Sequence, residues 1–222
     1  MLTHQVNGSS LRLKAPLVYS GAFFVFFAIT HWSSLFLFEH EIPHYQSAEI
    51  VMDKSTSSRI AIISDTHGYL DERIAAVVTG CDYVLHAGDV GGAGIIKKLK
   101  PRSKAIVVQG NNDVPEKWTK EELPILETLP MEAYLDLPGG RIVVVHGHRA
   151  GSVSTRHKRL RSLYVNVRAI VYGHSHRMVC DQSEYPWVIN PGAAGKARTF
   201  GGPSCIVLTA TAGEWTIETI RY

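Results

Sequence analysis

Five short apolar runs, rich in β-branched residues, recur along this chain, and a polar segment carrying Asp, Asn or His beside a glycine closes each one. Short continuous runs of this kind predict strands that are buried on both faces. The polar segments are residues 65–68, 88–89, 110–113, 146–148 and 173–176. One such segment would be weak support for a site. Five in the same position after a strand constrain the fold and indicate one shared site.

Helical patterns alternate with these strands. Residues 70–78 carry apolar side chains at helical spacing, and residues 95–99 predict a second helix. Strands and helices that alternate at this rhythm are typical of parallel βαβ units. In such sheets polar residues that bind ligands gather beyond the carboxyl ends of the strands. The five polar segments are therefore expected to converge.

The pattern changes after Ser175 to short strands separated by turns. These strands are residues 178–180, 187–189, 204–210 and 215–220, and we expect them to extend a second sheet. The predicted fold class is therefore α/β, with two packed mixed β-sheets flanked by helices in a four-layer α/β/β/α arrangement.

The polar segments hold a ligand set suited to divalent cations. Hard oxygens from Asp and Asn, together with imidazoles, suit two such cations at one site. For any single residue, a turn-forming or structural role is an equally good interpretation. Turn chemistry does not require the histidines, however, which favours the metal site for the set of eight: Asp65, His67, Asp89, Asn111, His146, His148, His174 and His176.

The order and spacing of these segments resemble the calcineurin-like metallophosphoesterases, and most closely their YfcE-type phosphodiesterase branch. The resemblance extends over residues 59–222 and includes the loop at residues 189–193. It implies that Asp65, His67 and His176 hold one metal and that Asp89 bridges to the second. The ligands implied to complete the second metal are Asn111, His146 and His174.

The resemblance implies a dinuclear metal-dependent phosphodiesterase that hydrolyses phosphate esters through a hydroxide bridging the metals. We expect two divalent ions, Mn²⁺ in the first place, with Ni²⁺, Mg²⁺, Fe²⁺ and Zn²⁺ as alternatives. The expected substrate is a small phosphodiester; nucleic acid is not indicated. The residues assigned to catalysis are Asp89, Asn111 and His148, and those assigned to substrate contact are Asn112, Arg149 and Arg198.

Asn112 bears on the choice of substrate. Many members of the wider superfamily carry His at this position, where it is thought to help protonate the leaving group. An amide cannot donate a proton as an acid, so Asn112 favours phosphodiesters or activated esters. Asp113 is expected to orient Asn111 or a metal-bound histidine, and His86 is expected to be structural.

Two alternative functions remain open. The same fold serves as a retromer subunit that binds proteins, although that subunit lacks part of the metal set. A nuclease or nucleotide phosphatase of the wider superfamily is the other alternative. The short chain lacks the capping domain that such enzymes often use.

Charge and cysteine content give weaker indications. The net charge of +3 does not by itself imply a nucleic-acid partner. A basic cluster at residues 156–168 is either a solvated helix face or a basic approach to the site. The three cysteines are widely spaced and suggest no disulfide framework, which indicates a reducing, cytoplasmic compartment.

Residues 1–51 differ from the rest of the chain. Residues 17–38 contain no Asp, Glu, Lys or Arg and are long enough to span a bilayer, so a membrane-anchored protein is the alternative localisation. The other interpretation is that Met52 is the native start, because the YfcE branch usually begins just before the first strand. The expected domains are an N-terminal extension, 1–51, and a catalytic domain, 52–222.

Removing residues 1–51 should leave a soluble, active enzyme, because all five polar segments lie after Met52. Residues 17–38 also have no polar stripe with which to lie on the domain surface. Soluble yield, melting temperature and diester hydrolysis of the 1–222 and 52–222 chains test this expectation. An insoluble or inactive short form would contradict it.

Overall fold

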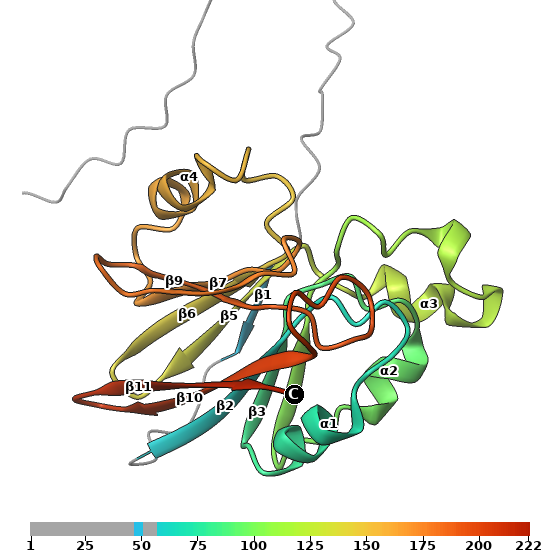
Figure 1. The fold of residues 1–222 in the computed structure, drawn as a ribbon, viewed down its shortest axis with the longest axis horizontal. Coiled ribbons are helices and arrows are strands. Elements are labelled where there is room, and N and C mark those ends of the chain that lie inside the picture. Colours follow the sequence, from blue (N-terminus) through green and yellow to red (C-terminus); the bar gives the residue numbers. More distant parts are fainter. Residues whose placement is uncertain (1–46, 51–56) are drawn as a thin grey trace, which may run out of the picture. The chain divides into compact units, whose positions relative to one another are not determined.

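The fold consists of two mixed β-sheets (Figure 1). The computed structural model describes the backbone of residues 47–50 and the whole of residues 57–222. One sheet has the order β1 (Ser47–Ile50), β5 (Glu132–Leu137), β6 (Gly140–Val145), β7 (Ala169–Val171), β9 (Trp187–Pro191) and β8 (Met178–Asp181). The other has the order β11 (Trp215–Arg221), β10 (Ser204–Thr211), β2 (Ser57–Ile63), β3 (Tyr83–His86) and β4 (Lys104–Val107).

The predicted βαβ units are present in both sheets. Strands β2, β3 and β4 are parallel, and the connecting helices are α1 (Glu72–Thr79) and α2 (Ala93–Lys98). Strands β6 and β7 are also parallel, with α4 (Arg156–Leu163) between them. Two short 3₁₀ turns, Pro115–Lys117 and Lys120–Glu122, lead into α3 (Leu123–Glu127).

Alternation along the strands produces the four layers. In β2, Ile60 and Ile62 face the core between the sheets, whereas the neighbouring Ala61 and Ile63 pack in the core that includes α1 and α2. In β6, Ile142 and Val144 likewise enter the inter-sheet core. The alternate side chains Val143 and Val145 pack against Leu160 of α4. Figure 1 shows α1 and α2 outside one sheet and α4 outside the other. The predicted fold class is therefore confirmed.

The prediction for the strands after Ser175 was wrong for two of the four. Strands β8 and β9 lie in the six-stranded sheet, as expected. Strand β10, however, pairs antiparallel with β2 in the five-stranded sheet, and β11 pairs with β10 there. Beside β2, both faces of β10 are covered. Ile206 and Leu208 enter the inter-sheet core, while Cys205 and Val207 pack on the α1 side.

Strand β1 falls inside the predicted N-terminal extension. It pairs in parallel with β5, from Ser47 opposite Glu132 to Ile50 opposite Leu135. A 47–222 chain is thus the matched control for the truncation at residue 52. The apolar residues 17–38 lie outside the described part of the chain. Within the described part, no helix is long and apolar enough to cross a membrane.

The topology brings the five polar segments to one place. They follow β2, β3 and β4 of one sheet and β6 and β7 of the other. Hydrogen bonds connect these ends within each sheet: Asp65 N–H donates to Gly88 O at 3.0 Å, and Gly173 N–H donates to His146 O at 3.1 Å. Between the sheets, His146 Nδ1 donates to Ala87 O at 2.8 Å. The carboxyl ends of strands from both sheets therefore form one polar region.

Candidate functional site

The polar loops hold their side chains with an unusual backbone. Seven non-glycine residues in the described part of the chain have positive φ, and five of them are predicted ligands. Left-handed backbone costs an L-residue roughly 1–2 kcal/mol, and such residues cluster where surrounding structure enforces them, often at functional sites. The five are Asp65, His67, Asp89, His174 and His176, with φ between 46° and 65°.

Two glycines allow the loops to approach each other closely. A Cβ on Gly110 would overlap the backbone nitrogen and Oδ1 of Asp89. A Cβ on Gly173 would overlap Ser64 Oγ and lie 3.0 Å from Asp65 Oδ2. Neither glycine has positive φ, so these positions require glycine for the close approach of the loops and not for a left-handed backbone.

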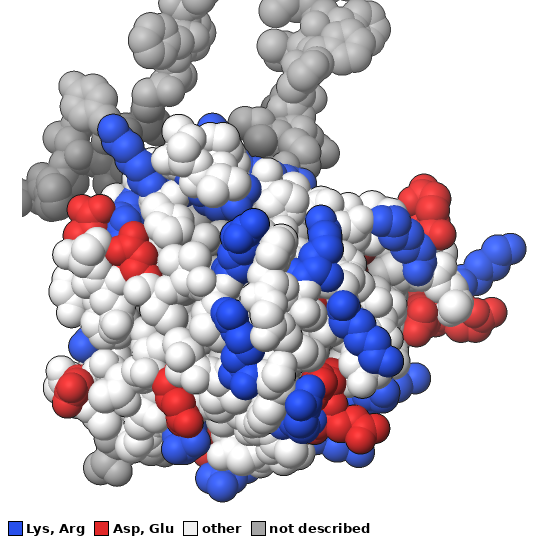
Figure 2. Space-filling view, viewed as in Figure 1, with Lys and Arg blue, Asp and Glu red and all other residues white. Residues whose placement is uncertain are grey.

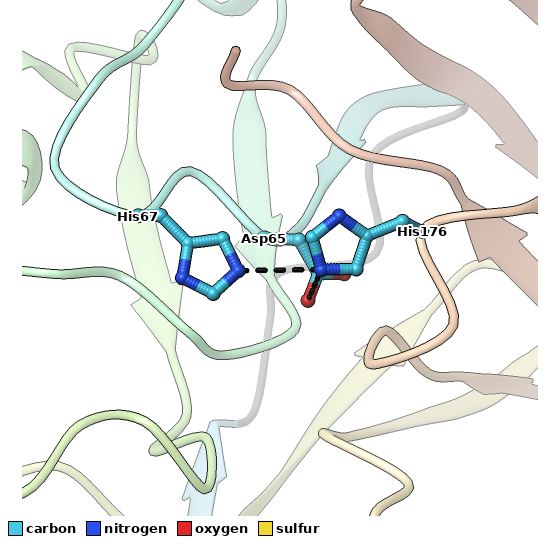
Figure 3. Close-up of side chains that lie close together, drawn as sticks. All are labelled: Asp65, His67 and His176. Atoms are coloured by element: carbon cyan, nitrogen blue, oxygen red, sulfur yellow. Dashed lines mark hydrogen bonds and ion pairs between the residues drawn. The ribbon is translucent and has the colours of Figure 1, made fainter. Parts of the chain in front are cut away.

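The first group of converging side chains is Asp65, His67 and His176 (Figure 3). The two imidazoles point toward each other from different loops, with their Nε2 atoms 3.2 Å apart. Asp65 Oδ1 lies 3.3 Å from His176 Nε2. One ligand atom from each of the three residues falls within 4.8 Å of the others.

The second group is Asp65, Asp89 and His146, so Asp65 belongs to both groups. His146 Nε2 lies 3.4 Å from Asp89 Oδ2 and 3.0 Å from Asn111 Oδ1. Asp89 Oδ2 is also 3.7 Å from His67 Nε2, which links the two groups. The structure thus brings Asp65, Asp89, Asn111 and His146 close together.

Backbone carbonyls orient the buried imidazoles of His146 and His176. His146 Nδ1 lies 2.8 Å from Ala87 O, and His176 Nδ1 lies 2.8 Å from Ala197 O. A carbonyl only accepts, so each Nδ1 carries a proton and donates it. In the neutral ring the Nε2 lone pair then faces the site, as in a metal-ligating histidine.

Burial and mutual charge set the ionisation of the cluster. Burial raises the pKa of Asp65 to about 7. Burial alone would raise the pKa of Asp89 too, but His146 and both hydrogen bonds from Asn112 outweigh it and hold that pKa below its usual range. Burial also lowers the pKa of His176 to about 4. Burial works against charge on His146, yet the Asp89 and Asp65 carboxylates raise its pKa.

The Asp65 carboxylate gives a direct test of whether a metal fits. Both of its oxygens are buried, and neither has a hydrogen-bond partner. A buried polar atom without a partner is costly. Divalent cations bound by Asp65, Asp89, Asn111 and the Nε2 atoms would supply the missing positive charge, and this oxygen and imidazole set suits them. The residues present therefore fit a divalent metal.

The remaining predicted residues lie around these two groups. His174 is outside both: its ring centroid is 5.2 Å from that of His146, edge to face. His148 packs 5.5 Å from His146, and its buried Nδ1 has no hydrogen-bond partner. Arg198 donates from Nη2 to His176 Nε2 at 3.0 Å. The next residue after His148, Arg149, is exposed.

Asn112 donates hydrogen bonds to the Asp89 carboxylate of the site. Its backbone N–H donates to Asp89 Oδ1 at 2.8 Å, and its Nδ2 donates to Asp89 Oδ2 at 2.7 Å. Lys117 in turn donates to Asn112 Oδ1. Asn112 therefore fixes the orientation of Asp89, a role the sequence did not suggest.

Asp113 has a different role from the one expected. It accepts from the backbone N–H groups of Val90, Gly91 and Gly110 at 2.9–3.0 Å. Within the described residues, the Asp113 carboxylate accepts from these amides and not from Asn111 or a histidine, because its loop turns it toward them. Asp113 thus joins the loop after β3 to the loop after β4.

Two further polar residues support the loops. His86 lies 2.8 Å from Thr66 Oγ1 and accepts from Gly88 N–H at 3.2 Å, which agrees with the expected structural role. Asn190 was missed as a site residue. Its Nδ2 donates to Gly173 O and to Ser175 Oγ, at 2.8 and 3.0 Å, and so holds the histidine loop after β7. Its position at the end of an apolar run, before Pro191 and Gly192, was the available signal.

Of the two interpretations of the basic cluster at residues 156–168, the solvated helix face describes Lys158 and Arg159, which are exposed, but not the remaining arginines. Arg156 is buried and donates to Gly151 O. Arg161 pairs with Asp181 at 3.0 Å and Glu184 at 3.1 Å, and Arg168 lies over the Trp215 ring. These side chains attach α4 and its flanks to the sheet. On the face shown in Figure 2, Lys and Arg are scattered among uncharged residues.

Replacing Asp65 with Asn should stabilise the metal-free protein. A carboxyl whose pKa is raised to about 7 keeps its proton in the folded state, so its contribution to stability falls as pH rises from about 4 to about 7. At about 1.4 kcal/mol per pKa unit, the loss amounts to a few kcal/mol. Asn is neutral at every pH, so the Asp65→Asn protein does not lose this stability as the pH rises.

Chemical denaturation in a chelator, from acid to neutral pH, measures this difference, and added Mn²⁺ should then stabilise the wild type more than Asp65→Asn. Parallel pH profiles and equal stabilisation by Mn²⁺ in the two proteins would contradict the role of Asp65.

Known proteins are similar to this chain in sequence and in fold. A probable metallophosphoesterase of Methanothermobacter thermautotrophicus is 26% identical over 167 residues, 73% of this chain and 91% of that protein. A phosphodiesterase of Methanocaldococcus jannaschii is 28% identical over 145 residues, 60% of this chain and 82% of that protein. The solved structure of vacuolar protein sorting 29 from Cryptosporidium parvum shares the fold, with a TM-score of 0.58 and 17% identity over 76% of this chain and 99% of that one. Residues 59–213 match the calcineurin-like phosphoesterase superfamily domain, so the chain belongs to this family of metal-binding phosphoesterases.

Proposed function

We propose that this phosphoesterase hydrolyses phosphodiesters at a site for two divalent cations formed by the ends of β2, β3, β4, β6 and β7. The observation that carries the proposal is the buried Asp65 carboxylate, which has no hydrogen-bond partner and is shared by both groups of ligand side chains. The name of the M. jannaschii relative supports the diester specificity.

Each ligand has a place in this proposal. Asp65, His67 and His176 hold one cation. Asp89 would bridge to the other cation, which Asn111 and His146 would also hold. His146 Nε2 lies 3.4 Å from Asp89 Oδ2 and 3.0 Å from Asn111 Oδ1. His174, whose ring packs edge to face against that of His146, would be the remaining ligand of the second cation. When bound, two cations lower the pKa of water and neutralise phosphate oxygens.

The surrounding residues orient the reactants. The two bonds from Asn112 fix the Asp89 carboxylate, so its oxygens need little rearrangement during turnover. The Arg198 guanidinium already reaches His176, and from there it can donate to a phosphate oxygen. Burial, with the charges of His146 and Arg149, lowers the pKa of His148 to about 4, so this ring is neutral at physiological pH and acts as a hydrogen-bond partner.

This set of residues favours diesters and esters with good leaving groups. Neither Asn112 nor neutral His148 is a strong proton donor, and general acid catalysis contributes about 10²–10⁴-fold where it operates. A substrate whose leaving group is stable as an anion needs less of that help. Mn²⁺ is the first proposed metal, and Ni²⁺, Mg²⁺, Fe²⁺ and Zn²⁺ also accept this mixture of oxygen and imidazole ligands.

The protein-binding scaffold is the second candidate, favoured by the fold shared with vacuolar protein sorting 29. Fold alone does not assign function. The scaffold needs no unpartnered buried carboxylate and no inward Nε2 lone pairs, whereas a cation site needs both. A phosphoesterase screen of the purified protein with added cations, on phosphodiesters, phosphomonoesters and cyclic nucleotides, separates the two candidates.

Asp89→Asn should abolish turnover and weaken both cations together. The amide replaces one oxygen of the bridging carboxylate with an NH₂ group, which would also face the donors of Asn112. Turnover, metal content by mass spectrometry and the melting temperature measure the effect, with the exposed Glu121→Gln as the matched control. Two bound equivalents and a normal rate would show that the bridging assignment is wrong.

Asn112→His should raise the rate on phosphomonoesters relative to diesters. A histidine can share in protonating a poor leaving group, at the cost of the Nδ2 bond to Asp89. The absolute rates should fall while the monoester-to-diester ratio of kcat/KM rises. If the ratio stays constant in a variant that still binds its metals, position 112 does not influence leaving-group protonation.

A further inference from the structure

A cavity of about 370 Å³ lies beside the candidate site, between α4 and the adjoining ends of β5 and β6. His146 and His148 line both the cavity and the site, so the two are continuous at these rings. The volume is within the range of pockets that hold small ligands. Of the residues considered above for the metal site or the substrate, only His146, His148 and Arg149 line this space.

The cavity wall is mainly apolar. Val145, Ala150 and Leu160 form a buried part of it, and Met131 adds a thioether. Leu163, at the end of α4, also lines it and remains 58% exposed. An exposed leucine on the wall of an apolar pocket beside a polar site is suited to contact with a ligand.

Several lining groups favour a flat aromatic ring over an alkyl chain. Tyr164 and His148 contribute aromatic rings to the lining, and Arg159 contributes a guanidinium, a planar group of the kind that stacks on aromatic rings. The Met131 sulfur makes favourable contacts with aromatic rings. Each of these groups makes a more favourable contact with an aromatic ring than with a methyl group.

The one carboxylate in the lining is held in place by two tyrosines. Glu132 accepts hydrogen bonds from the Tyr164 and Tyr134 hydroxyls, at 2.8 and 3.2 Å. Arg149 and Arg159 also line the cavity, so charges of both signs lie at its edge and the apolar wall decides what it holds. The cavity thus accepts an apolar part of a substrate whose phosphate lies at the site.

We propose that this cavity binds a flat aromatic ester group of the substrate, so that the enzyme prefers aryl phosphate esters to small alkyl ones. The inference rests on the proposed function, because it places the phosphate of the same substrate among the ligands described above. Leu163 and Met131 are its specificity-determining residues.

Binding of phenyl phosphate and methyl phosphate to the Mn²⁺-loaded protein tests the proposal by calorimetry. Phenyl phosphate should bind about tenfold more tightly, because only its ring buries apolar area in the cavity. Leu163→Ser and, independently, Met131→Ser should reduce this preference several-fold. Val153→Ser is the matched control, since Val153 is 78% exposed before α4 and does not line the cavity. Melting temperatures verify that each variant is folded.

The outcomes separate this inference from the proposed function, which is tested in parallel by hydrolysis of bis(4-nitrophenyl) phosphate. Hydrolysis without a preference for phenyl phosphate, or with a preference that both folded variants retain, overturns the cavity assignment alone. A preference lost in the variants but without hydrolysis of any diester supports the cavity and contradicts the proposed function. Failure of both phosphates to bind overturns the inference.

Discussion

The structure depends on placing two carboxylates, Asp65 and Asp89, inside one cluster of imidazoles. Neither oxygen of Asp65 has a hydrogen-bond partner, and burial raises its pKa to about 7. Charges buried in this way are unfavourable unless opposite charge compensates them. At neutral pH the buried Asp65 carboxyl therefore lowers the stability of the metal-free fold and provides an attraction for a cation. The free energy of cation binding would therefore add directly to the free energy of folding.

The fold supplies the means to hold this cluster. Strands from both sheets end at the same region. Asp113 joins the loops after β3 and β4 by accepting from three backbone amides. Asn190 fixes the loop after β7 in the same manner. The inter-sheet core and the helices on either side keep the strand ends in register. Rigid support of this kind preorganises ligands and makes the left-handed backbone of five site residues tolerable.

Much of this arrangement could be predicted from the chain because its cause is local. The runs before Asp65, Asp89, Asn111, His146 and His174 are continuous and apolar, so strands and their shared carboxyl edge follow from pattern alone. The sheet to which β10 belongs could not be read in this way, because burial on both faces suits either sheet. Strand β5 has a weaker signal, with Ala133, Leu135 and Leu137 buried between partly exposed residues.

The contacts around the ligands were less predictable, since they join residues distant in sequence. Asn112 bonding to Asp89 and Asn190 bonding to Gly173 O depend on loop geometry that no periodicity reports. The basic residues near α4 illustrate the same limit. Their spacing suggested a charged surface, whereas Arg156 is buried and Arg161 is paired with Asp181 and Glu184 across the sheet face.

The central claim is that this cluster holds two cations close enough to share a carboxylate. Electron paramagnetic resonance of the protein titrated with Mn²⁺ tests it most directly, because two Mn²⁺ ions about 3.5–4 Å apart interact magnetically. The account predicts a coupled multiline spectrum that reaches its maximum at two equivalents per chain. A simple six-line spectrum that saturates at one equivalent, or weak binding without saturation, would contradict it.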